Sequence, residues 1–235
     1  MSGHHHVPDG SRRLWLAVGV NGLLTIAQIA GGILSGSLSL IADALHNFSD
    51  AVSLIIALVA RKIARRPADD TMTFGYGRAE IVAALINYTT LIVIGLYLVY
   101  EAILRFIEPQ MIEGWLIVVI AGIALVVDLV TAALTYAMSK NSVNIRAAFL
   151  HNVADALGSI AVIVAGSLIL VYDWMIVDPI VTLMIAGYIL WQSFREIGPV
   201  IRLLMLGVPK DIDPSEILEA LAKIDGMESA HHLHV

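Results

Sequence analysis

Four side chains that can bind a metal ion repeat one spacing in two apolar stretches of this sequence. They are His46, Asp50, His151 and Asp155. In each pair the aspartate follows the histidine by four residues, so both side chains lie on one face of a helix. Two imidazoles and two carboxylates form a set that Zn2+ accepts as a tetrahedron with bonds of about 2.0 to 2.2 Å, whereas Mg2+ and Ca2+ need about six or more oxygens. The spacing therefore predicts one zinc-type site shared by two helices.

The residues around the two pairs are also similar. Positions 46–51 and 151–156 both read His-Asn-x-x-Asp-Ala, and a leucine precedes each histidine. A single histidine in an apolar helix is more often a hydrogen-bonding contact between helices than a metal ligand. Two copies of one motif favour the shared site over that alternative.

The composition indicates a membrane protein. Hydrophobic residues make up 58% of the chain and charged residues 14%, against averages of about 45 to 50% and about 25% in soluble domains. A run of about 20 apolar residues crosses a hydrocarbon core roughly 30 Å thick. Six runs reach or approach that length: 14–34, 38–60, 81–100, 115–138, 147–172 and 174–191. We therefore expect an all-α membrane protein with six transmembrane helices.

The basic residues predict the orientation of these runs. Thirteen of the fourteen Lys and Arg residues flank the same side of the membrane, and only Arg105 lies on the other. The positive-inside rule makes that side cytoplasmic, together with both termini. His46 then lies roughly 12 Å from the outer end of its run, and Asp155 lies roughly 15 Å from an inner helix end near Ile145. Both pairs meet near the midplane, where alternating-access carriers bind their substrates.

The apolar runs contain ionisable residues but no deep Lys or Arg to neutralise them. They are Asp43, His46, Asp50, Asp128, His151 and Asp155. An ionised aspartate near the bilayer centre costs about 2.5 to 3.5 kcal/mol on insertion scales. Protons, water or a bound cation must compensate, and a metal ion is the simplest. Cysteine is absent, which excludes thiolate ligands and disulfides, and no dense basic patch indicates a nucleic-acid partner.

The chain resembles the cation diffusion facilitators along nearly its whole length. The resemblance rests on the six runs and on four segments: 37–50, 67–70 (Pro-Ala-Asp-Asp), 74–80 (Phe-Gly-Tyr-Gly-Arg-Ala-Glu) and 151–155. It implies a homodimer in the lipid bilayer that exports a metal ion from the cytoplasm in exchange for protons, through the four predicted ligands. Histidine in both pairs is associated with zinc-preferring members, and carboxylates at both positions with manganese exporters. Zn2+ is thus the expected transported substrate, with Cd2+ and Co2+ as further candidates, and a bacterial inner membrane the expected location.

The loop 61–80 departs from the family pattern. Relatives that bind a second metal there use an aspartate and two histidines, but this sequence has Asp69 with Met72 and Tyr76 at the histidine positions. We therefore expect no strong loop site. Asp69 and Asp70 are interpreted as solvated charges or as a weak attraction for incoming cations.

Two further acidic residues in the apolar runs have open roles. Asp43 could assist the ligands, carry charge in a vestibule, or pair with an arginine such as Arg78, and this ion pair or simple helix packing is favoured. Asp128 has no partner four residues away. It could line a proton path or a cavity, or accept a hydrogen bond from Asn87 or Gln28.

The chain divides into three predicted parts. They are an N-terminal cytoplasmic tail, a six-helix membrane domain and the start of a cytoplasmic domain: 1–13, 14–207 and 208–235. The tail contains His4, His5 and His6, which are either a remnant of an affinity tag or a native tract that collects metal.

The sequence of the third part, 208–235, predicts a helix followed by a strand. A short soluble helix should end near position 226 and begin at an N-cap, a first-turn proline and a capping-box acid: Asp213, Pro214 and Glu216. The strand 230–235 would follow, as the start of a truncated α/β domain that the resemblance implies is ferredoxin-like. His231 matches a third metal site of the family, but its other ligands would lie beyond this chain. We expect no intact site there.

Three classes of function are compatible with a metal site in a membrane. An antiporter follows directly, because His and Asp must lose protons to bind Zn2+ and tend to regain them when it leaves. An intramembrane metalloenzyme would need an open coordination position and a general base, as in His-Glu-x-x-His. Neither is indicated, so we predict that the protein is not an enzyme. A passive channel or a metal-responsive scaffold would lack saturable transport that collapses with the pH gradient.

Overall fold

The protein is a helical bundle in the part that the computed structural model describes, which comprises residues 10–138, 143–208, 212–224, 226 and 233. Six long helices and a short one follow in order: α1 Gly10–Ser35, α2 Leu38–Ala64, α3 Ala79–Ile107, α4 Gly114–Met138, α5 Val143–Tyr172, α6 Val177–Leu204 and α7 Pro214–Ala222. No strand occurs among the described residues. The predicted all-α membrane region is confirmed.

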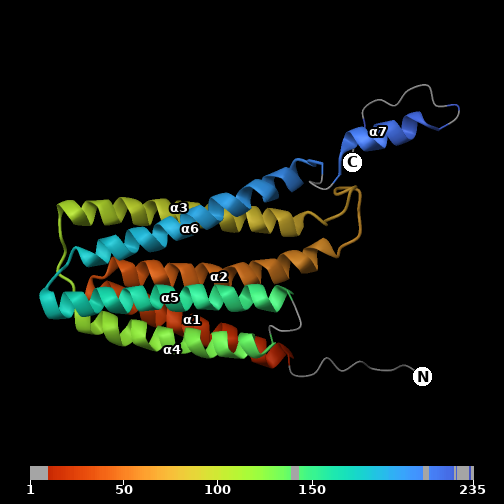
Figure 1. The fold of residues 1–235 in the computed structure, drawn as a ribbon. Coiled ribbons are helices and arrows are strands. Elements are labelled where there is room, and N and C mark those ends of the chain that lie inside the picture. Colours follow the sequence, from red (N-terminus) through yellow and green to blue (C-terminus); the bar gives the residue numbers. More distant parts are fainter. Residues whose placement is uncertain (1–9, 139–142, 209–211, 225, 227–232, 234–235) are drawn as a thin grey trace, which may run out of the picture.

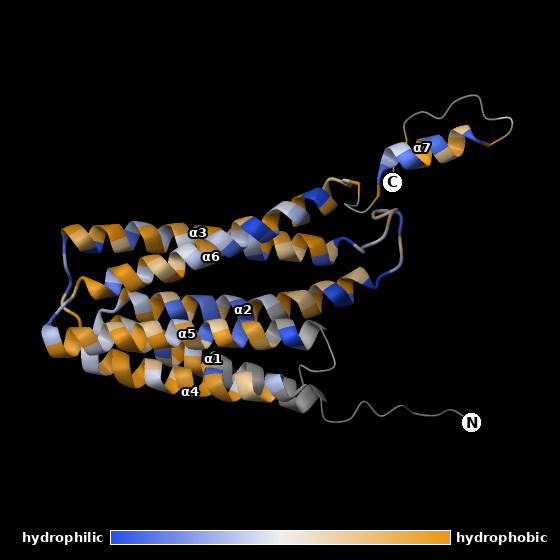
Figure 2. Ribbon diagram, in the orientation of Figure 1, coloured by the Kyte–Doolittle hydropathy of each residue, from blue (hydrophilic) through white to orange (hydrophobic). Residues whose placement is uncertain are grey.

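Five of the long helices are apolar and long enough to cross a membrane, namely α2 to α6. The apolar stretch found in α1 is shorter, Gly22–Ser35, so the sixth span stays a prediction. Apolar residues run along the six long helices, whereas the loops and α7 are more hydrophilic (Figure 2). Many of these apolar side chains are exposed on the bundle surface, as expected for surfaces that face lipid tails.

The sixth predicted run differs most from the observed helix. The prediction was 174–191, but α6 begins at Val177 and continues through Pro199 to Leu204. It begins later because the chain turns at Asp173, which has a positive φ of 55°. It ends later because the prediction followed the apolar residues only. The turns beyond Trp191 contain charged residues, which lower the hydropathy although the chain remains helical.

The helices lie side by side, and their connections lie at two ends of the bundle (Figure 1). The loop 65–78 joins α2 to α3 at one end, here called the loop end. The connections 36–37, 108–113 and 173–176 lie at the other, called the turn end. α2 is central and contacts α1, α3, α5 and α6, while α4 packs along α5 and α3 along α6.

The buried apolar core is concentrated near the turn end. One cluster consists of Leu40, Ile112, Ile117, Ala121, Val162, Ala165, Ile169 and Val181. A second consists of Leu38, Ala42, Leu98, Ala102 and Ala186. All of these residues belong to the halves of α2 to α6 next to the turn end, or to the α3–α4 connection. The described part of the bundle is therefore packed more tightly at the turn end than at the loop end.

A buried carboxylate ties three helices together at the turn end. Asp178, in the first turn of α6, is fully buried and accepts hydrogen bonds from Ser37 Oγ (2.6 Å), Ser39 Oγ (2.6 Å) and the backbone N–H groups of Leu38 and Ser39 (2.8 and 3.2 Å). The first N–H groups of a helix have no partner within it; the N-cap Ser37 binds that of Leu40, and Asp178 binds those of Leu38 and Ser39. Arg105 Nη1 of α3 lies 3.5 Å from Asp178 Oδ2.

The spacing of residues does not single out Asp178, because its partners on α2 are about 140 positions away in the chain. One signal does exist. Arg105 is the only basic residue predicted on the outer side of the membrane, so it departs from the positive-inside pattern. The same guanidinium also donates to the carbonyl oxygen of Gly36, which joins α3 to the turn before α2.

The short helix α7 begins where the sequence predicts. Asp213 is its N-cap and accepts a hydrogen bond from the backbone N–H of Ser215 at 2.9 Å, and Pro214 occupies the first turn. The helix ends at Ala222, earlier than predicted, and it buries no residue. It lies beyond the loop end of the bundle (Figure 1).

Replacing Asp178 with alanine is expected to destabilise the bundle, because two buried N–H groups at the N-terminus of α2 lose their acceptor and Arg105 loses its buried carboxylate. Breaking a buried pair of this kind costs about 3 to 5 kcal/mol. Thermal unfolding of the purified protein in detergent measures the effect. The control Glu113→Ala removes an exposed acid at the same end and is expected to change the midpoint little. Equal unfolding midpoints for Asp178→Ala and the parent would contradict the proposed stabilising role of Asp178.

Candidate metal site

The four predicted ligands converge between α2 and α5. His46 Nε2 lies 3.7 Å from Asp50 Oδ2 and 3.5 Å from Asp155 Oδ1. His151 Nε2 lies 3.1 Å from Asp50 Oδ2 and 3.6 Å from Asp155 Oδ2. Each imidazole therefore faces both carboxylates, one from its own helix and one from the other. Single ligand atoms of His46, Asp50 and Asp155 lie within 4.8 Å of one another, and His151 lies outside this compact group of three.

The four nitrogen to oxygen separations are close to those between ligands around a tetrahedral ion, although His46 and His151 approach different oxygens of Asp155. Bonds of about 2.1 Å place neighbouring ligand atoms about 3.4 Å apart, and the four distances observed here run from 3.1 to 3.7 Å. The same contacts can form without metal if a proton lies between each nitrogen and oxygen. The geometry thus accommodates a small cation or protons at the same atoms.

Burial of the site is uneven along the bundle axis. The side chains of His46 and Asp155 are 10% and 11% exposed, whereas those of Asp50 and His151 are 30% and 35% exposed. Asp155 Oδ1 and His46 Nδ1 are buried and have no hydrogen-bond partner among the described residues. An unpaired buried acceptor is costly. A cation next to Asp155 Oδ1 would remove that cost.

Neighbouring helices support the ligands on α2. Tyr188 of α6 packs edge-on against the ring of His46, with centroids 6.2 Å apart. Asn87 of α3 accepts a hydrogen bond from Ser53 Oγ at 2.6 Å, one turn beyond Asp50. The sequence does not single out Tyr188 or Ser53, since an aromatic residue or a serine in an apolar run is common.

Comparison with known proteins decides the family. The sequence model of the cation efflux transmembrane domain matches residues 14–205. The chain belongs to the cation efflux family. The predicted resemblance to the cation diffusion facilitators is thereby confirmed, as are a transporter in a membrane and an inner-membrane location.

Several curated bacterial members of the cation efflux family are similar over almost the whole chain. A cadmium, cobalt and zinc/H(+)-K(+) antiporter of Bacillus subtilis is 38% identical over 99% of this chain and 76% of its own length. The metal cation efflux system protein CzcD of Cupriavidus metallidurans is 35% identical over 99% and 73%. The zinc transporter ZitB of Escherichia coli is 34% identical over 98% and 75%. These relatives are transporters, which supports the prediction that the chain is not an enzyme.

Asp43 lies beside the site in this cation efflux protein without forming the proposed ion pair. It is buried and accepts a hydrogen bond from Gln28 Nε2 of α1 at 2.7 Å. Among the described residues it makes no ion pair with Arg78, which is exposed at the N-terminus of α3. A side chain at Gly158 of α5 would come within 3.2 Å of its carboxylate. Asp43 thus packs where α1, α2 and α5 meet.

Asp128 also has a different partner from the predicted ones. It accepts a hydrogen bond from Ser159 Oγ of α5 at 2.8 Å. The expected bond from Asn87 or Gln28 is wrong, because α4 packs along α5, while Asn87 binds Ser53 and Gln28 binds Asp43. Its role on a proton path stays a prediction.

Asp69 organises the loop 65–78 instead of standing free in solvent. Its Oδ1 accepts hydrogen bonds from Thr71 Oγ1 (2.6 Å) and from the backbone N–H groups of Thr71 (2.9 Å) and Met72 (2.8 Å), and its Oδ2 accepts one from the Tyr76 hydroxyl (2.8 Å). Both oxygens are thus engaged within the loop. This arrangement supports the prediction that the loop holds no strong metal site.

Two histidine predictions lie outside the described residues. They concern His231 at the third family site and the tract His4 to His6. The strand predicted for 230–235 also lies there, apart from Leu233.

Asp69→Ala is expected to loosen the loop without changing the number of Zn2+ ions bound. The hydrogen bonds from Thr71, Tyr76 and Met72 hold the pKa of Asp69 well below its usual range. Because the pKa of Asp69 is lowered in the folded protein, its hydrogen bonds contribute their full stability above the ordinary aspartate pKa of about 3.9. That stability is lost only as the pH falls through the lower, folded-state pKa. Between about pH 5 and pH 8 the turn stays intact.

Hydrogen exchange at the Thr71 and Met72 amides measures this effect, with Asp70→Ala as the matched control. Exchange is expected to accelerate only in Asp69→Ala. Loss of a bound Zn2+ ion in Asp69→Ala, at unchanged exchange, would mean that the loop is a metal site.

Proposed function

We propose that this protein exports Zn2+ from the cytoplasm in exchange for protons, through a tetrahedral site formed by His46, Asp50, His151 and Asp155. The observation that carries the proposal is the set of nitrogen to oxygen distances, 3.1 to 3.7 Å, between α2 and α5. Each distance is close to the spacing of about 3.4 Å between ligands around one tetrahedral ion, and the proposal requires one oxygen of Asp155 to serve both histidines' side of the site. The names of relatives that transport zinc, cadmium and cobalt support the same substrate class.

The donor set favours Zn2+ over other divalent ions. Two imidazole nitrogens and two carboxylate oxygens suit Zn2+, Co2+ and Cd2+ better than Mg2+ or Ca2+, which take oxygen ligands at higher coordination number. We therefore propose Cd2+ and Co2+ as further substrates.

Charge neutrality supplies the coupling to protons. Two carboxylates and two neutral imidazoles are neutralised by one Zn2+ ion, and no Lys or Arg forms an ion pair with them among the described residues. When the ion leaves, the negative charge in the membrane must be compensated again. Protons bind the same nitrogen and oxygen atoms, so binding of Zn2+ releases protons and binding of protons releases Zn2+.

The uneven burial supports access to the site from the cytoplasm. The loop end is the cytoplasmic end by the positive-inside rule. Asp50 and His151 lie at the loop-end side of their pairs and are the more exposed ligands. The two apolar core clusters lie between the site and the turn end. We infer that this arrangement receives Zn2+ from the cytoplasm.

The same proposal includes the parts of the architecture that are inferred from sequence. Both termini are cytoplasmic, α1 forms a sixth span, and 14–207 is the membrane domain. The segment 208–235, including α7, is cytoplasmic, and the protein is a homodimer.

Zinc flux into proteoliposomes tests the transport site. Asp155→Ala is expected to reduce saturable Zn2+ uptake at least tenfold, since loss of even a supporting group around a metal costs about 10 to 100-fold. The matched control is Asp70→Ala, an exposed loop acid that should leave uptake unchanged. Equal uptake by Asp155→Ala and the parent would exclude this site, and uptake by the parent that is indifferent to an imposed pH gradient would exclude antiport.

Single-cysteine labelling tests the direction of access, because the chain has no native cysteine. Ala51→Cys, next to Asp50 on its loop-end side, is expected to react with a membrane-impermeant thiol reagent from the cytoplasmic side and to be protected from the outside. Met111→Cys, exposed at the turn end, should show the reverse. Faster labelling of Ala51→Cys from the outside would overturn the inward-open assignment.

A further inference from the structure

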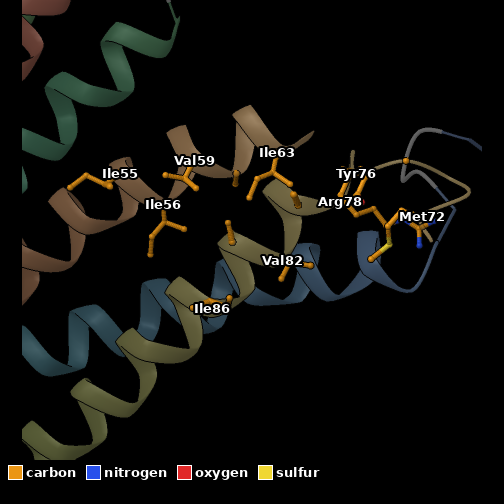
Figure 3. Close-up of a pocket in the computed structure, with 13 residues that line it drawn as sticks. Ile55, Ile56, Val59, Ile63, Met72, Tyr76, Arg78, Val82 and Ile86 are labelled. Carbon is orange, nitrogen blue, oxygen red and sulfur yellow. The ribbon is translucent and has the colours of Figure 1, made fainter. Parts of the chain in front are cut away.

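An apolar groove runs between α2 and α3 on the outside of the bundle (Figure 3). Its volume is about 530 Å3, within the range of about 300 to 1,000 Å3 that is usual for ligand pockets. Its walls are isoleucines and valines on facing helix surfaces, together with a methionine of the loop: Ile55, Val59, Ile63, Met72, Val82 and Ile86. Most of these side chains are exposed, so the groove is open at the surface of the bundle.

Polar contacts between α2 and α3 mark the ends of the groove. Ser53 Oγ donates to Asn87 Oδ1 at 2.6 Å at the end nearer the membrane centre. At the loop end, Arg61 Nε lies 3.7 Å from Glu80 Oε1. Between Ile55 and Ile63 the groove follows α2 for roughly 12 Å, at about 1.5 Å per residue. This elongated apolar shape fits a single hydrocarbon chain.

The mouth of the groove at the loop end is positively charged. Arg78 lines it and is exposed, and Lys62 and Arg65 end α2 nearby. Within the described residues none of these three has a carboxylate at ion-pair distance. Asp69 does not neutralise them by direct contact, since both of its oxygens bind groups of the loop. The mouth therefore offers uncompensated cations at the level of the membrane surface.

We propose that this groove binds an anionic phospholipid of the cytoplasmic leaflet. One acyl chain lies between α2 and α3, and the phosphate group contacts Arg78 and the neighbouring basic residues. Basic pockets between transmembrane helices on the cytoplasmic side suit such headgroups. The ligand must be amphipathic and negatively charged, because the groove is apolar along its length and basic only at its mouth.

A second copy of the chain fits this groove less well. A two-fold contact places the same surface on both subunits, and the residues that line the groove include no carboxylate that could pair with the cations at its mouth. Like charges set against each other across an interface are unfavourable. An anionic lipid compensates these charges instead.

Native mass spectrometry of the full chain tests the headgroup preference. The protein is extracted from vesicles of equimolar phosphatidylglycerol and phosphatidylcholine with the same acyl chains. We expect the parent to retain phosphatidylglycerol preferentially and Arg78→Gln to lose about fivefold of that preference, the factor corresponding to about 1 kcal/mol per basic residue at an anionic surface. The control Arg195→Gln removes an exposed arginine of α6 and should keep the preference. Equal retention of both lipids by the parent would overturn the proposal.

Photocrosslinking tests the occupant itself. A photoreactive side chain at position 82, in the wall of the groove, is expected to give an adduct with the mass of one phospholipid in vesicles that contain phosphatidylglycerol. An adduct between two protein chains instead would assign the groove to a subunit interface and overturn the lipid site. Zinc uptake by the Arg78→Gln protein verifies that this variant is folded.

Discussion

Two carboxylates and two imidazoles share one small space between α2 and α5, inside a bundle whose surface is suited to lipid. Ionised groups in such surroundings are costly unless an opposite charge or a hydrogen bond compensates them. The nitrogen to oxygen distances allow a metal ion or protons to provide that compensation, but not both at the same atoms. This mutual exclusion is the physical basis of the exchange that we propose.

The other buried acids are compensated differently, and the contrast sets them apart from Asp155. Asp178 accepts four hydrogen bonds at the N-terminus of α2. Asp43 binds Gln28, and Asp128 binds Ser159. Each of these carboxylates has a protein donor that stays in place. Asp155 Oδ1 has none among the described residues, which suits a group whose partner must come and go.

The bundle is asymmetric along its axis, and this asymmetry links the site to its surroundings. The core clusters and the Asp178 tie hold the turn end together. Towards the loop end the ligands become more exposed, and α2 and α3 separate enough to leave a groove. α2 carries two ligands, is bound by Asp178 at one end, and forms one wall of the groove at the other. Forces at either end therefore act on the helix that holds half of the site.

The sequence by itself determined the features that depend on residues close together in the chain. These are the apolar helices, the paired ligand spacing and the cap of α7 at Asp213, because periodicity and capping act within a few residues. The tertiary structure alone decided which helices are neighbours. It set the 3.1 to 3.7 Å meeting of the two pairs, gave Asp128 its partner Ser159, and brought Asp178 to α2 across 141 positions. No local pattern encodes such contacts, since they arise only when distant helices pack.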